Sequence, residues 1–257
     1  MILDEILAHK RQEIAQLRRQ LDLTGLPGPR PFAAALRQSG VSVIAEFKRR
    51  SPSGGLIRPD ATPADIGRLY AQHGATAMSV LTDERYFGGT DADLVAAREA
   101  SGLPVLRKDF VIDPFQIYEA RATGADAVLL IVRALTDTEL RSFLELARVL
   151  GIAALVETHS EEEVRRAVDA GAEIVGVNNR DLDTLVTDVT LAPRLRALVP
   201  TACVFVAESG ISTPEHMRAL ADHGVDAVLI GEALLRASDP GERLAELLAA
   251  AAHGARI

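Results

Sequence analysis

Charged side chains recur at the ends of short apolar runs in this sequence, where parallel strands often carry catalytic groups. Glu46 and Lys48 close one such run, and their spacing of two residues puts both side chains on one face of a strand. Lys108, Glu157 and Glu208 close three others. A single charge is usually solvated, but several that converge are costly to bury unless they pair or react. Because crowding shifts lysine and glutamate pKa values toward neutrality, the pattern predicts a proton-transfer site.

A second group of residues has the chemistry of a phosphate site. Ser209 and Gly210 follow the seventh apolar run, and Gly231 follows the eighth. In barrels of parallel strands, the loops after strands seven and eight often bind phosphate through backbone N–H groups, and glycine lets the phosphate approach closely. We therefore expect phosphate to bind there, with the carboxylate of Glu232 pointing away from it.

The loop after the first run, residues 49–55, mixes charge with a rigid proline and two glycines. It is either a plain surface loop or a mobile lid that carries Lys48 and Ser51 to a ligand. Asn178 and Arg180 follow the sixth run, so they add an amide and a further cation to the same end of the strands.

Other kinds of site find no support in the sequence. The histidines lack the H-x-H or H-E-x-x-H spacing of a zinc site, and several lie near predicted helix ends, where a surface or capping role suffices. They are His9, His73, His159, His216, His223 and His253. Neither a Walker loop nor a dinucleotide glycine motif occurs. The single cysteine, Cys203, excludes internal disulfides, and its position predicts a small buried side chain that faces the helices.

Composition narrows the possible partners. The 257 residues carry 28 Lys and Arg against 36 Asp and Glu, and the resulting net charge of −8 repels nucleic acid and anionic membranes. The longest apolar run, residues 127–132, is far shorter than the ~20 residues that span a bilayer. Asp4 and Glu5 replace the apolar core of a signal peptide, and a single cysteine suits a reducing compartment. We therefore expect a cytoplasmic protein with neither nucleic acid nor membrane as partner.

Short apolar runs alternate with helix-length stretches after residue 40. The runs are rich in Val, Ile and Leu without polar alternation, which is typical of strands covered on both faces. The eight runs are Val41–Phe47, Thr76–Leu81, Pro104–Arg107, Ala127–Val132, Ile152–Val156, Ile174–Val177, Cys203–Ala207 and Ala227–Ile230. Helices are predicted between them, for example over Asp137–Leu150 and Ser160–Ala170, with Thr138 and Ser160 at N-cap positions.

A short repeat joins helices to strands. Gly74, Gly124, Gly171 and Gly224 each follow a predicted helix and precede an apolar run, at spacings of 50, 47 and 53 residues. Glycine suits the left-handed residue that follows a helix, and the spacing is that of two strand–helix units. Eight strands in this α/β pattern favour a closed (β/α)8 TIM barrel over a doubly wound sheet of six or seven strands.

Residues 1–40 are predicted to form a helical extension that packs on the barrel of residues 41–257 and makes a single domain with it. An amphipathic helix is expected over residues 2–21, with Lys10 and other basic residues away from its apolar stripe. That stripe consists of Ile2, Leu3, Ile6, Leu7, Ile14 and Leu17. A cluster of Gly and Pro at residues 25–31 ends this helix, and a short second helix is expected over residues 32–37.

Six segments together resemble the indole-3-glycerol-phosphate synthase family. They are Ala45–Ser53, Ser79–Asp83, Leu103–Phe110, Leu155–Glu157, Val177–Leu182 and Glu208–Ile211. The resemblance implies a barrel enzyme of tryptophan biosynthesis, a decarboxylating lyase without metal or organic cofactor. Its substrate would be a phosphosugar, 1-(2-carboxyphenylamino)-1-deoxyribulose 5-phosphate. The aromatic carbon that bears the carboxylate attacks the ketone, and carbon dioxide and then water leave.

The resemblance also implies roles for individual residues. Lys108 would be the general acid on the ketone oxygen, and Glu157 a carboxylate at the reacting centre. Glu46 and Lys48 would form a pair in which Lys48 also reaches the substrate anions, while Glu208 orients the lysines. Asn178 and Arg180 would position the substrate, Ser51, Ser209, Gly210 and Gly231 would hold the phosphate, and Phe87 and Phe110 would line the pocket for the anthranilate ring.

Three positions depart from the family pattern. Gly54 stands where many members have Lys, Leu185 where an aromatic residue is frequent, and Glu232 where some have Ser. These departures concern loop charge, packing and one phosphate contact rather than the expected proton transfers.

Two alternatives remain open at this point. An isomerase resembling phosphoribosylanthranilate isomerase would carry Cys or Asp on strand one and Asp on strand six, whereas this chain has Glu-x-Lys and Asn-Asn-Arg. A non-catalytic phosphosugar-binding barrel would keep the glycine loops but could lose Lys108 or Glu157, and both are present. In every case we expect a monomer that binds a small phosphorylated molecule.

Overall fold

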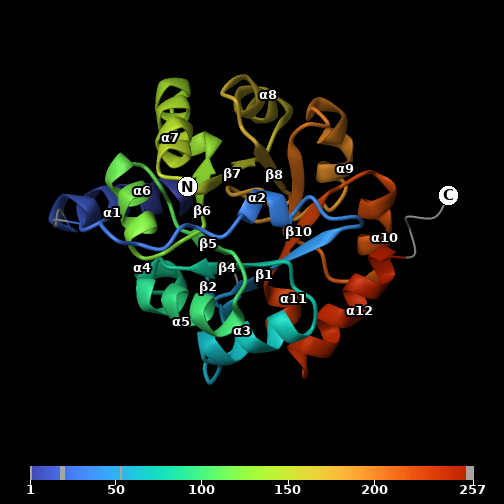
Figure 1. The fold of residues 1–257 in the computed structure, drawn as a ribbon. Coiled ribbons are helices and arrows are strands. Elements are labelled where there is room, and N and C mark those ends of the chain that lie inside the picture. Colours follow the sequence, from blue (N-terminus) through green and yellow to red (C-terminus); the bar gives the residue numbers. More distant parts are fainter. Residues whose placement is uncertain (1, 18–20, 53, 253–257) are drawn as a thin grey trace.

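The computed structural model describes residues 2–17, 21–52 and 54–252 of the chain. Within this part, eight parallel strands close into a barrel in the order β1-β10-β9-β8-β7-β6-β5-β4, and helices surround it (Figure 1). The barrel strands are β1 (Ser42–Phe47), β4 (Ala77–Leu81), β5 (Val105–Lys108), β6 (Ala127–Ile131), β7 (Ala153–Thr158), β8 (Ile174–Asn178), β9 (Val204–Glu208) and β10 (Ala227–Ile230). The predicted TIM barrel is therefore confirmed, and the doubly wound sheet is excluded.

Most of the helices connect one barrel strand to the next, and β2 (Arg50–Ser51) with β3 (Gly55–Leu56) forms a small antiparallel hairpin after β1. The helices are α1 (Ile2–Leu17), α2 (Phe32–Ala35), α3 (Pro63–Gln72), α4 (Glu84–Phe87), α5 (Asp91–Ser101), α6 (Pro114–Ala122), η1 (Val132–Ala134), α7 (Asp137–Val149), α8 (Glu161–Asp169), α9 (Leu191–Leu195), η2 (Arg196–Leu198), α10 (Pro214–Asp222), α11 (Glu232–Leu235) and α12 (Pro240–Ala252).

Local sequence signals start and stop these elements. Ser160 caps α8 as predicted, by accepting a hydrogen bond from the backbone of Glu163. The N-cap of α7 is Thr136 and not Thr138, because Thr136 and Glu139 form a reciprocal capping box that places Thr138 inside the first turn. The four repeated glycines all have φ between +68° and +92°, which confirms the left-handed conformation expected of them.

Alternate residues of each barrel strand face opposite sides of the wall. On β1, Val43 and Ala45 pack in the layer between strands and helices, whereas Ile44 packs inside the barrel. Phe32 and Leu36, from α2 and its end, are fully buried and join the inner cluster. Cys203 precedes β9 and packs toward the helices as predicted, but it is half-buried rather than fully buried.

The N-terminal helix α1 buries Leu3, Ile6, Leu7 and Ile14 of its predicted stripe. The side chains of Ile2 and Leu17 and the predicted helical residues 18–20 lie outside the described residues, and Leu21 is not helical, so the predicted helix is too long. Lys10, expected to lie away from the apolar stripe, is itself buried, with only 1% of the residue exposed. Its ammonium is buried because two buried carboxylates of the barrel neutralise it, at Asp83 and Asp109.

Within the residues described, no helix has the length and apolar character needed to cross a membrane.

Candidate active site

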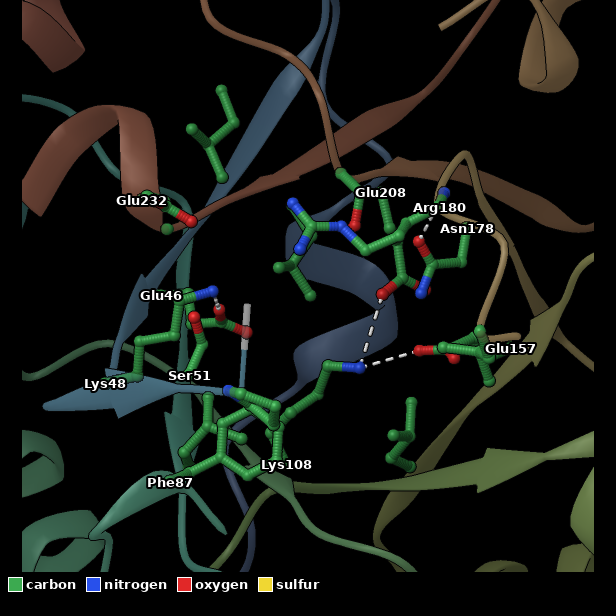
Figure 2. A pocket seen from close by; sticks show the side chains of 18 of the residues that line it. Glu46, Lys48, Ser51, Phe87, Lys108, Glu157, Asn178, Arg180, Glu208 and Glu232 are labelled. Carbon is green, nitrogen blue, oxygen red and sulfur yellow. Dashed lines mark hydrogen bonds and ion pairs between the residues drawn. The ribbon is translucent and has the colours of Figure 1, made fainter. Parts of the chain in front are cut away.

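A cavity of about 430 Å³ opens at the C-terminal ends of the barrel strands. All thirteen residues expected at the site line it, and nine of them are labelled in Figure 2. They are Glu46, Lys48, Ser51, Phe87, Lys108, Phe110, Glu157, Asn178, Arg180, Glu208, Ser209, Gly210 and Gly231. The closed barrel brings them together because the ends of all its parallel strands meet at one face.

Lys108 lies in the middle of this cavity between two carboxylates (Figure 2). Its Nζ is 2.7 Å from Oε2 of Glu157 and 3.5 Å from Oε2 of Glu208. Burial alone would lower the pKa of Lys108, but attraction by Glu157, Glu208 and Glu46 outweighs burial and raises it. Lys108 is therefore an ammonium group at neutral pH, the form that can donate a proton.

The two carboxyls that share Lys108 differ in proton affinity. Burial favours protonation of Glu157, but Lys108 and His159 overcome this effect and lower its pKa. For Glu208, burial is only partly offset by Lys108 and is reinforced by repulsion from Glu157 and Glu46, so its pKa is raised to about 8. The other oxygen of Glu208, Oε1, is buried and has no hydrogen-bond partner among the described residues. Glu208 can therefore hold a proton near neutral pH while Glu157 stays ionised.

Two glycines, one within β8 and one directly after β10, make room for the carboxylates of Glu208 and Glu46. A Cβ atom at Gly176 of β8 would collide with Oε1 of Glu208, and one at Gly231 would lie 2.6 Å from Oε1 of Glu46. Gly231 thus has a packing role beside Glu46 and Lys48 in addition to the close phosphate approach expected of it.

Glu46 and Lys48 enter the cavity from the end of β1. Lys48 Nζ lies 2.8 Å from Oε1 of Glu46, and the hydroxyl of Ser79 donates to Oε2 at 3.2 Å. Both carboxylate oxygens of Glu46 are therefore held by neighbours, as the two-residue spacing predicts for a pair on one strand face.

The predicted phosphate loop after β9 has unusual backbone geometry. Ser209 and Gly210 are both left-handed, with φ of +66° and +76°. The side-chain amide of Asn179 donates to the carbonyl of Ser209 at 3.0 Å and fixes the loop. A Cβ atom at Gly210 would collide with Thr187 and Val189, so this glycine is also required by packing inside the protein.

Glu232 lines the cavity, and that its carboxylate points away from a bound phosphate stays a prediction (Figure 2). Its carboxylate is held there by Arg236, whose Nε lies 2.7 Å from Oε1. Arg236 was missed in the sequence, although its spacing of four residues from Glu232 is typical of a helical ion pair. The same guanidinium donates to the carbonyl of Gly54 at 2.7 Å, so it joins α11 to the loop after β1.

The loop of residues 49–55 forms the β2–β3 hairpin beside the cavity. Ser51 and Pro52 line the cavity, and the hydroxyl of Ser51 accepts a hydrogen bond from the backbone of Gly54 at 2.9 Å. Ser53, which also belongs to the predicted lid, lies outside the described residues.

The apolar side of the cavity comes from two barrel loops and α1. The rings of Phe87 and Phe110 lie 6.2 Å apart at an angle of 37°. Leu3 and Ile6 of α1 also line the cavity, a contribution that the sequence analysis missed although both belong to the apolar stripe.

Lys10 joins α1 to the two loops that carry these rings. Its Nζ is 3.0 Å from Oδ2 of Asp83 and 3.0 Å from Oδ1 of Asp109. Asp83 caps α4, which ends in Phe87, and Asp109 accepts a hydrogen bond from the backbone of Phe110 at 2.8 Å. One buried ammonium therefore contacts the anchor residues of both aromatic side chains.

His159 is another residue that the sequence did not reveal, and a surface or capping role is wrong for it because its side chain is only 2% exposed. Its side chain is buried between Glu157, with Nε2 3.4 Å from Oε1, and Glu163, with Nδ1 3.3 Å from Oε2. The signal was its spacing of two residues from Glu157, the spacing that also relates Glu46 and Lys48.

Among the residues described, no group of three or more His, Cys, Asp or Glu side chains is arranged to hold a metal ion.

Comparison with known proteins agrees with this geometry. The sequence model of the family "Indole-3-glycerol phosphate synthase" matches residues 3–247. An indole-3-glycerol phosphate synthase of Acidithiobacillus ferrooxidans is 48% identical over 96% of this chain and 98% of its own. Indole-3-glycerol phosphate synthase 2 of Streptomyces coelicolor is 52% identical over 90% of this chain and 92% of its own.

Solved structures of lower identity share the fold. Thiamine phosphate pyrophosphorylase from Pyrococcus furiosus superposes with a TM-score of 0.63 at 18% identity, over 83% of this chain and 96% of its own. A 3-hexulose-6-phosphate synthase gives a TM-score of 0.61 at 16% identity, over 82% of this chain and 99% of its own. At these identities the likeness concerns the barrel alone.

Proposed function

The chain belongs to the indole-3-glycerol phosphate synthase family, and we propose that Lys108, Glu157, Glu46 and Lys48 carry its proton transfers. It is a decarboxylating lyase of tryptophan biosynthesis that converts 1-(2-carboxyphenylamino)-1-deoxyribulose 5-phosphate to indole-3-glycerol phosphate. The observation that carries the residue assignment is the position of Lys108, whose ammonium is held in the middle of the cavity by two buried carboxylates.

Ring closure forms a bond between the aromatic carbon that bears the carboxylate and the ketone carbon. Lys108 donates a proton to the ketone oxygen as this bond forms, so the developing alkoxide becomes a hydroxyl group. Glu157, 2.7 Å from Lys108, stabilises the positive charge that develops on the aromatic ring and nitrogen. The carbon–carboxylate bond then breaks, carbon dioxide leaves, and its bonding electrons restore the aromatic ring.

Dehydration completes the indole. The new hydroxyl leaves as water, and the neighbouring carbon loses a proton, so the double bond of the five-membered ring forms. Glu46 and Lys48 are 2.8 Å apart and supply a base and an acid for this step. Glu208 keeps Lys108 oriented through the contact at 3.5 Å.

Substrate binding divides between the two sides of the cavity. The backbone of Ser209, Gly210 and Gly231, with the hydroxyl of Ser51, holds the phosphate. Phe87 and Phe110 enclose the anthranilate ring, while Lys48, Asn178 and Arg180 contact the carboxylate and the sugar hydroxyls. Lys48 and Arg180 are assigned to the anionic groups of the substrate because they are cations. Phe87 and Phe110 are assigned to its apolar face because they are aromatic.

Residues 1–40 and the barrel of residues 41–257 act as a single domain, because Leu3 and Ile6 of α1 contribute to the cavity wall. We place the protein in the cytoplasm as a monomer with neither nucleic acid nor membrane as partner. The net charge of −8 and the single cysteine support this assignment.

The direct test mixes the protein with the carboxyphenylamino substrate in buffer that contains a metal chelator. Indole absorbance and released carbon dioxide are followed together, and we expect both in equal amounts. A substrate analogue without phosphate, measured by calorimetry, should bind at least tenfold more weakly. Absence of an indole product would overturn the proposed reaction, and equal affinity for both ligands would overturn the phosphate site.

A further inference from the structure

The side of Glu157 opposite Lys108 is occupied by a buried histidine. Oε2 of Glu157 contacts Lys108 at 2.7 Å, and Oε1 contacts Nε2 of His159 at 3.4 Å. The His159 side chain is only 2% exposed and lies behind the carboxylate, since it is absent from the residues that line the cavity. It therefore touches a catalytic group without reaching the substrate.

The groups around His159 favour its charged form. From α8, Glu163 places Oε2 3.3 Å from Nδ1, and the same oxygen accepts the backbone N–H of His159 at 2.8 Å. Arg133 of η1 holds the other oxygen of Glu163 at 3.2 Å and also pairs with Asp183 of the loop after β8. From the barrel, Lys108 of β5 and Glu208 of β9 lie beyond Glu157. The imidazole ring thus has a carboxylate oxygen within ion-pair distance of each nitrogen, and this arrangement favours the protonated ring.

Contact with His159 distinguishes the two carboxyls that share Lys108. Glu157 contacts Lys108 and His159, whereas Lys108, at the longer distance of 3.5 Å, is the only cation paired with Glu208 in the part of the chain that the structure describes. Two carboxylates this close to one ammonium repel each other, and the one with fewer cationic partners takes up a proton first. A buried imidazolium behind Glu157 therefore determines that Glu208, and not Glu157, takes up the proton.

We propose that His159 is a positioning residue that is an imidazolium at neutral pH, keeps Glu157 ionised and oriented, and leaves the exchangeable proton of the pair on Glu208. This inference rests on the proposed function, because it assigns protonation states within the same active site. The pKa of His159 agrees with this geometry. It is raised to about 9, because Glu157 and Glu163 outweigh the effect of burial.

The first test measures His159 directly and needs no substrate. The protein is labelled with ¹³C-histidine, and the imidazole signals are followed by NMR from pH 5 to pH 10. The His159 signal, identified by its loss in His159→Gln or in His159→Asn, should titrate about two pH units above the ordinary value of 6.5. Titration at or below 6.5 would show that the ring is neutral in the working enzyme and would overturn the proposal.

The second test measures the consequence for catalysis. His159→Gln keeps an N–H group near Oε1 of Glu157 but removes the positive charge, so the pKa of Glu157 should rise. The acid limb of the kcat profile should move up by about one pH unit or more, with KM changed less than about threefold. A reduced kcat whose pH profile keeps the wild-type shape would mean a merely structural role and would contradict the proposal.

Glu163→Gln, on α8, removes the carboxylate at the other nitrogen of the His159 ring. It provides a second test if His159→Gln does not fold. Loss of this carboxylate should lower the pKa that NMR measures for His159. The acid limb of the kcat profile should move up, as in His159→Gln. His223→Gln, at the exposed end of α10, is the matched control and should leave the kcat profile unchanged. If the wild-type protein makes no indole, the proposed function fails, while the NMR titration still decides the protonation of His159.

Discussion

Spacing along a single strand explains much of the chemistry at the scale of residues. Glu46 at the end of β1 and Lys48 just after it are two residues apart and meet at 2.8 Å, as the sequence predicts. Contacts across the barrel, such as that of Lys108 with Glu157 and Glu208, can be predicted only if the strands are assumed to close into a barrel. His159 was overlooked because its partner Glu163 lies on α8, and sequence spacing does not show that α8 turns this carboxylate back toward β7.

The roles of the two glutamates can be separated by single-turnover kinetics. Glu46→Gln should preserve the release of carbon dioxide but slow indole formation by about 10²-fold, because Glu46 belongs to the dehydration pair. Glu157→Gln should slow both signals, since this carboxylate acts from the first step. Carbon dioxide and indole absorbance are recorded in the same mixing experiment. Equal slowing of both signals in Glu46→Gln would contradict the division of roles.

Gly231 offers a test of packing at the Glu46–Lys48 pair. Gly231→Ala places a methyl group only 2.6 Å from Oε1 of Glu46, closer than real Cβ contacts, so the carboxylate must move. A displacement of this size costs on the order of 10²-fold in rate, and we expect the loss in kcat. A rise in KM with unchanged kcat would show that Gly231 serves the phosphate alone. Gly28→Ala, whose added Cβ meets nothing within 4 Å, is the control.

At the scale of elements, strands were easier to predict than the attachment of α1. The apolar runs located the barrel strands to within one or two residues, because strands covered on both faces are continuously apolar. The stripe of α1 predicted which side is buried, but a lysine at position 10 predicts solvent exposure. Its burial depends on Asp83 and Asp109, which are distant in sequence and adjacent only in the barrel.

Lys10→Met should destabilise the protein by about 3–5 kcal/mol, because it leaves Asp83 and Asp109 buried without their shared cation. The midpoint of urea unfolding should fall accordingly, and KM should rise because the loops of Phe87 and Phe110 lose an anchor. Arg11→Met, at the neighbouring exposed position, should change stability by no more than about 0.5 kcal/mol. Similar urea midpoints for the two variants would contradict the role of the buried ammonium.

At the scale of the whole molecule, the repeat of glycines after helices predicted the fold, and closure of the barrel then assembles the site. Each glycine marks the return of the chain from the helix layer to the start of a strand, so the opposite strand ends collect at one face. The cluster of charges at that face also affects stability. Glu208 and His159 both have raised pKa values, to about 8 and about 9.

Both raised values predict that stability falls with rising pH. The folded protein holds the Glu208 proton more tightly than the unfolded chain, so stability decreases from about pH 4.5 to pH 8. The interactions of His159 are fully present below pH 6.5 and are lost as the pH rises through about 9. The melting temperature should therefore be higher at pH 6 than at pH 9.

Glu208→Gln removes the first of these effects and should reduce the fall in melting temperature by several degrees, since 1 kcal/mol corresponds to about 2–4 °C in a chain of this size. The melting temperatures of wild type and variant are compared from pH 5 to pH 9. Parallel curves for the two proteins would contradict the raised proton affinity of Glu208.

The central claim is that Lys108, held between Glu157 and Glu208, is the acid that drives ring closure. The most direct measurement is the single-turnover rate of indole formation by Lys108→Met, with affinity for indole-3-glycerol phosphate measured by calorimetry on the same preparation. We predict a rate lower by about 10²–10⁴-fold, the usual contribution of a general acid, with affinity within a few-fold of wild type. Indole formation within a few-fold of the wild-type rate would contradict the assignment.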